Sequence, residues 1–372
     1  MVAFVGRKYE LSVLQNLLKK RQAQLIILKG RRRIGKSRLL QEFGKIVGRV
    51  HIFVGLAPEK GVTAADQRKE FARQLGVEFG VRGLSTDDWG DLFWHLSQHI
   101  KSGRVLVVFD EISWMALDEP LYLPKLQMAW ENYFKENSQL IFALCGSISM
   151  WIDENILSST GFMGRQSLVM TLKELSLTEC NEFWRDYQHT VSAQEKLLTL
   201  AVTGGIPRYL EEINPALPAV QNIRNLCFTQ EGILFREFGQ IFSDLFGEYQ
   251  AIYKSICEAL ATGAADAQTI YERTHMLGGG DDYKRLLNLA LTGFISKDYS
   301  WKIHTGKLAK IAWYRLSDNY CRFYLKYIYP NQHKIENSDY NDISLSSLPE
   351  WSSIIGLQIE NLVLNNRKLI KQ

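Results

Sequence analysis

Cysteine is scarce in this chain of 372 residues, and its few copies follow no pattern. The five are Cys145, Cys180, Cys227, Cys257 and Cys321. They are odd in number, scattered, and without the Cys-x-x-Cys spacing of metal-binding and redox motifs. The sequence therefore excludes a disulfide framework and a zinc site, and it predicts free thiols in a reducing compartment.

Long apolar runs are also missing. No stretch approaches the roughly 18 apolar residues that span a bilayer. Residues 1–7 lack the basic-then-apolar layout of a signal peptide, and the chain contains no internal repeat or low-complexity tract. We therefore expect a cytoplasmic globular protein that has no contact with a membrane.

Positive charge is in small excess, with a formal net charge of +4. This balance permits contact with nucleic acid but does not argue for it, because a basic surface can be local. Hydrophobic residues at 46% and charged residues at 23% are ordinary for a globular protein with buried cores. The length favours two or three domains.

The first half of the chain alternates short apolar runs with helix-like segments, which is typical of a parallel sheet flanked by helices. The predicted strands are residues 25–28, 50–54, 105–109, 140–145 and 168–172. Several of them are apolar at consecutive positions, as strands covered on both faces are. A long helical stretch is predicted over residues 64–99.

A glycine-rich loop lies directly between the first predicted strand and a helix-like segment. Its residues are Gly30, Arg31, Arg32, Arg33, Ile34, Gly35, Lys36 and Ser37, and Arg38 follows it. The order strand, Gly-x-x-x-x-Gly-Lys-Ser, helix is that of a P-loop. The two glycines let backbone N–H groups wrap a phosphate, and the helix N-terminus adds its positive dipole end. These nine residues are therefore candidates for binding ATP.

Within this loop, Lys36 is expected to reach the β- and γ-phosphates as a catalytic cation, and Ser37 to ligate Mg²⁺. The three loop arginines leave two interpretations open. Either one of them contacts the γ-phosphate or a partner, or all three are solvated residues at variable positions.

A second motif, which is acidic, follows the strand predicted over residues 105–109. An apolar strand that ends in two acids is the Walker B pattern, and the two acids are Asp110 and Glu111. Asp110 is expected to hold the Mg²⁺ ion through its water shell, and Glu111 to orient and polarise the attacking water. Together with the P-loop, this pattern predicts an ATP phosphohydrolase.

A small polar residue, Ser147, ends the next predicted strand. This position suits a sensor that hydrogen-bonds the γ-phosphate or the lytic water. The alternative is a simple Gly-Ser turn after a strand.

With these motifs in order along the chain, the sequence resembles the archaeal-type ATPase family, a branch of the AAA+/STAND ATPases that is also found in bacteria. The matching segments are residues 4–11 (FVGRKYEL), 30–37 (GRRRIGKS), 109–111 (FDE), 145–147 (CGS), 164–165 (GR), 175–177 (LSL), 204–210 (GGIPRYL) and 314–318 (YRLSD). The likeness thus extends over nearly the whole chain.

The resemblance implies further roles. Residues 4–10 would lie near the adenine, and Pro207 would pack near the base within a Gly-x-Pro element whose helical lid reports the nucleotide state. Arg165 would act as a catalytic arginine finger, in cis or from a neighbouring subunit of a homo-oligomer, unless it is an ordinary surface arginine. Arg208 is a weaker candidate for a second sensor.

Members of the family often end in a restriction-endonuclease-like domain that opens with Gly-x-x-Phe-Glu. Residues 356–360 (GLQIE) resemble that opening with Ile359 in place of Phe, and the chain stops at Gln372 before the later metal-binding positions. We assign no nuclease activity to these residues. The expected architecture is an AAA+-type ATPase domain (1–175), a helical lid (176–244), a winged-helix domain (245–318) and a helical tail (319–372) that resembles the start of a truncated nuclease-like domain.

The predicted winged helix consists of helices over residues 249–260, 267–273 and 281–291, followed by a hairpin of residues 294–299 and 311–316. The third helix would enter a major groove of double-stranded DNA. Candidate DNA contacts are Lys284, Arg285 and Asn288 on that helix and Lys302, Lys307 and Lys310 around the hairpin, mostly to phosphates. Asp281 and Asp282 oppose this interpretation, and docking to a protein partner is the alternative. The aromatic stretch 320–329 is expected to pack in a core.

Two functions follow. The chain is either an ATP-hydrolysing machine that acts on or near DNA, or a STAND-like switch that turns over ATP rarely and signals to a protein partner.

Overall fold

The computed structural model of the protein describes residues 4–81, 83–84, 86–147, 149–187, 189–302, 304–340 and 343–370, without the side chains of residues 149, 301 and 302. The chain divides into two compact units. We call residues 7–31 with 35–172 the P-loop unit, and residues 1–6, 32–34 and 173–372 the C-terminal unit.

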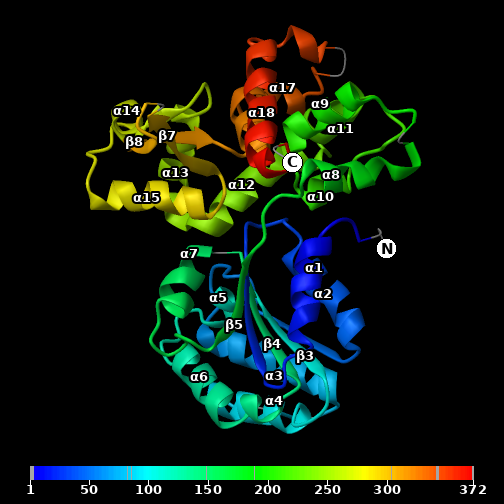
Figure 1. The fold of residues 1–372 in the computed structure, drawn as a ribbon, viewed down its shortest axis with the longest axis vertical. Coiled ribbons are helices and arrows are strands. Elements are labelled where there is room, and N and C mark those ends of the chain that lie inside the picture. Colours follow the sequence, from blue (N-terminus) through cyan, green and yellow to red (C-terminus); the bar gives the residue numbers. More distant parts are fainter. Residues whose placement is uncertain are drawn as a thin grey trace. The chain divides into compact units, whose positions relative to one another are not determined.

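The P-loop unit is built around a five-stranded sheet in the order β2-β3-β4-β1-β5 (Figure 1). Every pair of neighbouring strands in it is parallel. The strands are β1 (Gln24–Lys29), β2 (Val50–Val54), β3 (Val105–Asp110), β4 (Leu140–Gly146) and β5 (Gln166–Thr171). The predicted α/β class and the five predicted strands are confirmed. β1, β3 and β4 are buried along their whole length, which explains their unbroken apolar runs.

Alternate residues of these strands point to opposite faces of the sheet. Phe53, Phe109 and Phe142 lie in one large apolar core with aromatic residues of the helices that follow β2 and β3. Leu40 and Phe43, from the helix after the P-loop, are fully buried in the same unit. Figure 1 shows helices on both sides of the sheet, as its doubly buried strands require.

The helical stretch predicted over residues 64–99 is two helices rather than one. α3 (Ala64–Phe79) ends at Gly80, which has φ 70°, and α4 (Trp89–His99) begins after Asp88, whose side chain accepts the Gly90 N–H. A left-handed glycine and an Asp N-cap are local stop and start signals. The other helices are α1 (Lys8–Leu17), α2 (Lys36–Val47), α5 (Ile112–Met115), α6 (Tyr122–Asn132), α7 (Ser149–Ile152), and the short turns η1 (Phe134–Glu136) and η2 (Asp153–Leu157, π-helical).

The C-terminal unit is mainly helical from Leu177, as predicted. Its first part contains α8 (Leu177–Cys180), η3 (Asn181–Tyr187), α9 (Ala193–Thr203), α10 (Pro207–Leu210), α11 (Ala219–Cys227), α12 (Ile233–Phe246) and η4 (Gly247–Tyr249). The next part contains α13 (Gln250–Ala259), β6 (Ala265–Asp266), α14 (Ala267–Thr274), α15 (Gly280–Leu291), β7 (Ile295–Lys302) and β8 (Lys307–Leu316). Three helices and a hairpin were predicted here. The hairpin strands are longer than expected, and β6 adds a third strand in the order β6-β8-β7.

The last part of the chain contains buried hydrogen bonds between polar side chains next to an aromatic core. Its elements are α16 (Asn319–Phe323), η5 (Tyr324–Ile328), η6 (Tyr329–Asn331), α17 (Gln332–Glu336), η7 (Leu345–Ser347), α18 (Trp351–Asn365) and α19 (Arg367–Ile370). Tyr320 and Tyr327 are almost fully buried, so the core-packing prediction for the aromatic stretch is confirmed. Residues 356–360 lie in the middle of α18, where Gln358 exchanges hydrogen bonds with the main chain and side chain of Asn319.

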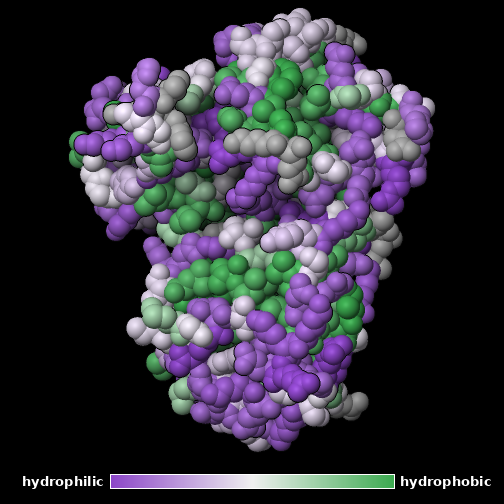
Figure 2. All heavy atoms as spheres, in the orientation of Figure 1, coloured by the Kyte–Doolittle hydropathy of each residue, from purple (hydrophilic) through white to green (hydrophobic). Residues whose placement is uncertain are grey.

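Between residues 4 and 370, leaving aside the gaps given above, no helix combines the length and apolar composition needed to cross a bilayer. On the face shown in Figure 2, the surface of the P-loop unit over α4 and α6 is mainly hydrophilic. The aromatic residues of these helices, such as Trp89 and Phe93, are instead buried.

Candidate functional site

The P-loop leaves β1 at its carboxyl end and runs into α2. Gly30 and Gly35 have φ angles of 151° and 89°, a range that favours glycine. Gly35 is the N-cap residue of α2, and Lys36 is the first residue of that helix. The backbone N–H groups of the first turn of α2 are therefore free of helical partners and suit an anion.

Lys36 is buried, with 5% of its surface exposed. Its Nζ donates to the carbonyl oxygens of Gly30 (2.9 Å) and Arg31 (3.2 Å) and to Oγ of Ser147 (3.1 Å). All three acceptors are neutral oxygens. A buried ammonium held by neutral acceptors is a favourable place for an anionic group, because a charge in a low-dielectric site gains most from an opposite charge.

The Walker B strand brings a carboxylate to the same edge of the sheet. Asp110 is the last residue of β3, and its Oδ2 accepts a hydrogen bond of 2.5 Å from Oγ of Ser37. Parallel strands end at a common edge, so the loop after β1 and the end of β3 can meet although Ser37 and Asp110 are 73 positions apart in the chain. A hydroxyl and a carboxylate in contact form the usual protein half of a Mg²⁺–nucleotide site.

Glu111 is connected to the sensor candidate. Its carboxylate accepts Ser147 Oγ–H at 2.5 Å and Ser147 N–H at 3.1 Å. The register pairs Phe109 of β3 with Leu144 of β4, so the residues just beyond the two strand ends lie side by side. Ser147 thus contacts Lys36 and Glu111 at once.

Below these groups, Cys145 of β4 is fully buried. Burial and the nearby Asp110 raise the pKa of its thiol well above the usual value. The thiol therefore stays protonated and adds no charge beneath the site.

Residues 4–213 match the family model described as an ATPase domain predominantly from Archaea. The chain belongs to this family. It is 27% identical over 362 residues to an uncharacterised protein of Methanocaldococcus jannaschii. The matched region covers 96% of this chain and 76% of that relative.

Solved structures show the same fold for this archaeal-type ATPase. A Walker-type ATPase of Pyrococcus abyssi covers 87% of this chain and 96% of its own, with TM-score 0.57 and 18% identity. The structure of the ORC2 protein of Aeropyrum pernix, in ADPNP–ADP complexes, matches 99% of this chain and 96% of its own chain, with TM-score 0.50 and 15% identity. At these identities the likeness supports the P-loop fold, whose parallel sheet is flanked by helices.

The P-loop arginines of this ATPase differ in environment. Arg31 is buried, with 6% of its surface exposed, so it is not a solvated loop residue. Arg32 and Arg33 group with the C-terminal unit, where Arg33 Nε lies 2.7 Å from Glu237 Oε1 and Arg32 is paired with Asp244. The hydrogen bond to Glu237 raises the pKa of Arg33. Ile34 is buried beside them.

Arg165 lies at the opposite edge of the sheet from the P-loop. It immediately precedes β5, whose Gln166 pairs with Leu25 near the start of β1, whereas the P-loop follows the end of β1. Its Nε donates to Glu131 Oε1 of α6 at 2.5 Å.

Pro207 and the weaker candidate Arg208 lie in the C-terminal unit. Pro207 is the first residue of α10 and Arg208 pairs with Glu212 at 2.7 Å. The preceding Gly205 packs tightly, since a Cβ there would lie 2.3 Å from the carbonyl oxygen of Leu175. The Gly-x-Pro element is thereby fixed to the segment that enters the helical part of the unit.

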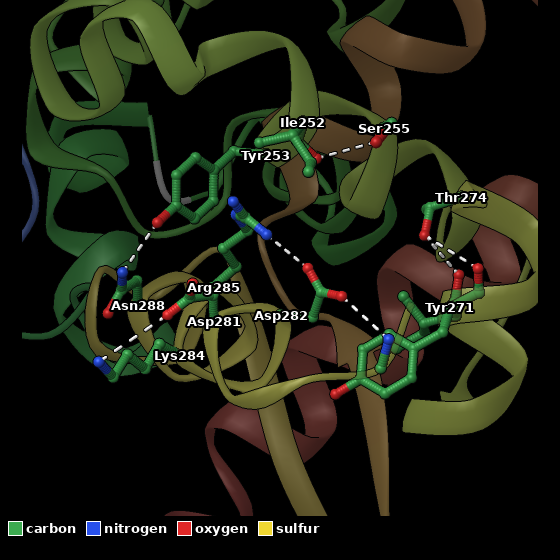
Figure 3. A network of polar contacts seen from close by, with 12 residues as sticks. Ile252, Tyr253, Ser255, Tyr271, Thr274, Asp281, Asp282, Lys284, Arg285 and Asn288 are labelled. Atoms are coloured by element: carbon green, nitrogen blue, oxygen red, sulfur yellow. Dashed lines mark hydrogen bonds and ion pairs between the residues drawn. The ribbon is translucent and has the colours of Figure 1, made fainter. Parts of the chain in front are cut away.

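The helix predicted to read DNA has its polar residues largely engaged within the C-terminal unit (Figure 3). Arg285 is paired with Asp282 of the same helix, and Asn288 Nδ2 donates to the hydroxyl of Tyr253 at 2.8 Å. Lys284 stays 75% exposed, 3.9 Å from Asp281. Lys307 and Lys310 on β8 are exposed, whereas the side chain of Lys302 lies outside the described residues.

One residue beside the nucleotide site was not predicted. Lys29, at the end of β1 and directly before the P-loop, is paired with Asp153 of η2. Neither residue belongs to a motif, and the two are 124 positions apart in the chain, so no local pattern links them. The pair is therefore visible only in the tertiary structure.

Proposed function

We propose that this ATPase hydrolyses ATP with Mg²⁺ at the carboxyl edge of its sheet. The observation that supports the proposal is the hydrogen bond between Ser37 Oγ and Asp110 Oδ2, with Glu111 next in the chain. Ser37 and Asp110 would hold Mg²⁺, which stabilises negative charge on the phosphates when bound. Lys36 would neutralise the β- and γ-phosphates from a buried position.

Glu111 would act as the general base, and Ser147 as the sensor. A carboxylate that accepts a hydroxyl and an amide N–H is oriented before the substrate arrives, which suits a group that must align a water molecule. Because Ser147 contacts both Glu111 and Lys36, a γ-phosphate that engages Lys36 would change the surroundings of Glu111 directly.

Arg165 would complete a neighbour's site in a homo-oligomer, since in its own chain it precedes the amino end of β5. Pro207 would pack near the base. Both assignments carry over from the family resemblance and depend on the assembled, nucleotide-bound protein.

The test is steady-state hydrolysis of ATP by the purified chain, with Mg²⁺ present and after chelation. The proposal expects turnover that requires Mg²⁺ and saturates with ATP. Tight ATP binding without turnover would instead support the alternative, a nucleotide-dependent switch that signals to a protein partner.

Contact with double-stranded DNA is a second candidate function, and the exposed lysines Lys284, Lys307 and Lys310 favour it. The part of the chain formed by α13, α14, α15 and the β7–β8 hairpin would act as a winged helix. Because Arg285 and Asn288 are engaged inside the unit, such contact would go to phosphates and would discriminate little between sequences. A duplex-dependent rise in ATP turnover would support this function over protein docking.

A further inference from the structure

Two glutamine side chains of α3 cover the outer edge of β2. β2 is the edge strand of the sheet, and Leu56 lies two residues beyond its end. Among the described residues, no strand of this sheet pairs with the side of Val54 and Leu56 that faces away from β3. Gln74 accepts the Val54 N–H at 2.8 Å and donates to the Val54 carbonyl at 2.9 Å. Gln67 does the same for Leu56, with both distances 2.9 Å. Each carboxamide therefore replaces the peptide group of a missing strand.

The residue between these two points of attachment touches the Walker B turn. Gly55 donates its N–H to the carbonyl of Asp110 at 3.0 Å. A Cβ on Gly55 would lie 2.9 Å from the carbonyl oxygen of Glu111 and 3.0 Å from the amide nitrogen of Met115. The segment that Gln67 holds is thus in direct contact with the first turn of α5.

That turn keeps Glu111 in an unusual conformation. Glu111 has φ 52° and ψ 53°, the left-handed region that residues with a Cβ adopt only where their surroundings enforce it. Its carbonyl accepts the Trp114 N–H at 2.8 Å, and Ser147 holds its carboxylate from the other side. Displacement of Gly55 would remove the contact that supports the backbone of Glu111 and of the first turn of α5.

We propose that Gln67 is a positioning residue for ATP hydrolysis, which acts through Leu56 and Gly55 to hold Glu111 in the geometry of a general base. The proposal rests on the proposed role of Glu111. Gln67 is 2% exposed and grips the residue next to Gly55 on the side toward α3. Gln74 makes the same pair of hydrogen bonds with Val54, on the other side of Gly55. Val54 is the last residue of β2 and is paired with Asp110 of β3, whereas Leu56 lies beyond the end of the strand, so Gln74 is the control.

The two variants Gln67→Met and Gln74→Met remove one carboxamide each and keep a similar side-chain length. Both should lower the urea midpoint of unfolding, since each leaves a strand edge without partners. Only Gln67→Met should lower kcat, by about tenfold, because small displacements of a catalytic group are costly. Its dissociation constant for Mg²⁺–ATP should stay within about twofold of the wild type, since the phosphate-binding groups are untouched.

A second measurement does not depend on turnover. Hydrogen exchange of the Trp114 and Met115 amides reports the first turn of α5, and it should accelerate in Gln67→Met and stay near the wild-type rate in Gln74→Met. Equal exchange in both variants, or equal kcat values, would overturn the proposal and leave both glutamines as edge covers. If the wild type shows no turnover while exchange still separates the variants, the proposed function fails but the positioning of Glu111 by Gln67 holds.

Discussion

The carboxyl edge of the sheet in the P-loop unit and helix α15 in the C-terminal unit both carry a cluster of charged residues, but they use these charges differently. At the sheet edge, Lys36 is held by neutral oxygens, so its charge is available to an incoming anion. On α15, Arg285 is already paired with Asp282 three residues before it. A motif cation is therefore better placed to bind an anion when the fold holds it with neutral oxygens than when a carboxylate is already paired with it.

The largest expected effect lies at the sheet edge. Lys36→Ala should weaken Mg²⁺–ATP binding by at least about a hundredfold, because it removes the buried cation placed for the β- and γ-phosphates. Calorimetry with Mg²⁺–ATP measures this. Lys45→Ala is the control, since Lys45 lies on the same helix, pairs with Glu42 and is exposed. Undiminished affinity of the Lys36 variant would show that the nucleotide binds elsewhere.

Glu111→Gln should separate binding from chemistry. The carboxamide keeps the shape and can still accept the Ser147 hydroxyl, but it cannot take a proton from water. We expect retained ATP binding and a turnover lower by about a hundredfold or more. Phosphate release at saturating ATP gives the rate, and Glu136→Gln, at an exposed position, is the matched control. Normal turnover in the Glu111 variant would transfer the role of base to another group.

The strands, the P-loop and the acidic pair could all be predicted from sequence, because each depends on residues that are neighbours in the chain. The break between α3 and α4 also had local signals, Gly80 and Asp88, which the continuous helical prediction overlooked. The contact of Ser147 with both Glu111 and Lys36, by contrast, depends on the register of β3 against β4. A register between distant strands leaves no pattern in a single sequence.

The same reasoning applies to α15. The spacing of Asp282 and Arg285 is that of a helical ion pair and is visible in the sequence. The hydrogen bond from Asn288 to Tyr253 joins two helices and is not. The sequence offers three residues of α15 as candidate DNA contacts, with protein docking as the alternative, and the fold leaves mainly Lys284 exposed among the three.

Ser147→Ala should have an intermediate effect. Loss of the hydroxyl removes one hydrogen bond from Glu111 and one from Lys36, so turnover should fall by about tenfold with little change in ATP affinity. Ser113→Ala is a matched control, because the buried Ser113 hydroxyl has no hydrogen-bond partner within the part of the chain that the structure describes. Equal rates in the two variants would reduce Ser147 to a turn residue.

The smallest expected effect concerns DNA, and it compares two adjacent residues of α15. If the lysines exposed on the C-terminal unit contact phosphates, duplex affinity should fall steeply with salt, because each neutralised phosphate releases condensed counterions. Lys284→Ala should flatten the slope of log K against log salt by roughly one unit, as expected for one lost contact. Arg285→Ala should change the slope less, since Asp282 already neutralises that guanidinium.

Fluorescence anisotropy of a labelled duplex over a salt series measures both variants, and ATP turnover should persist in each. If neither Lys284→Ala nor the Lys307→Ala, Lys310→Ala double variant alters the slope, the exposed lysines do not meet DNA, and docking to a protein partner becomes the better account of this part of the chain.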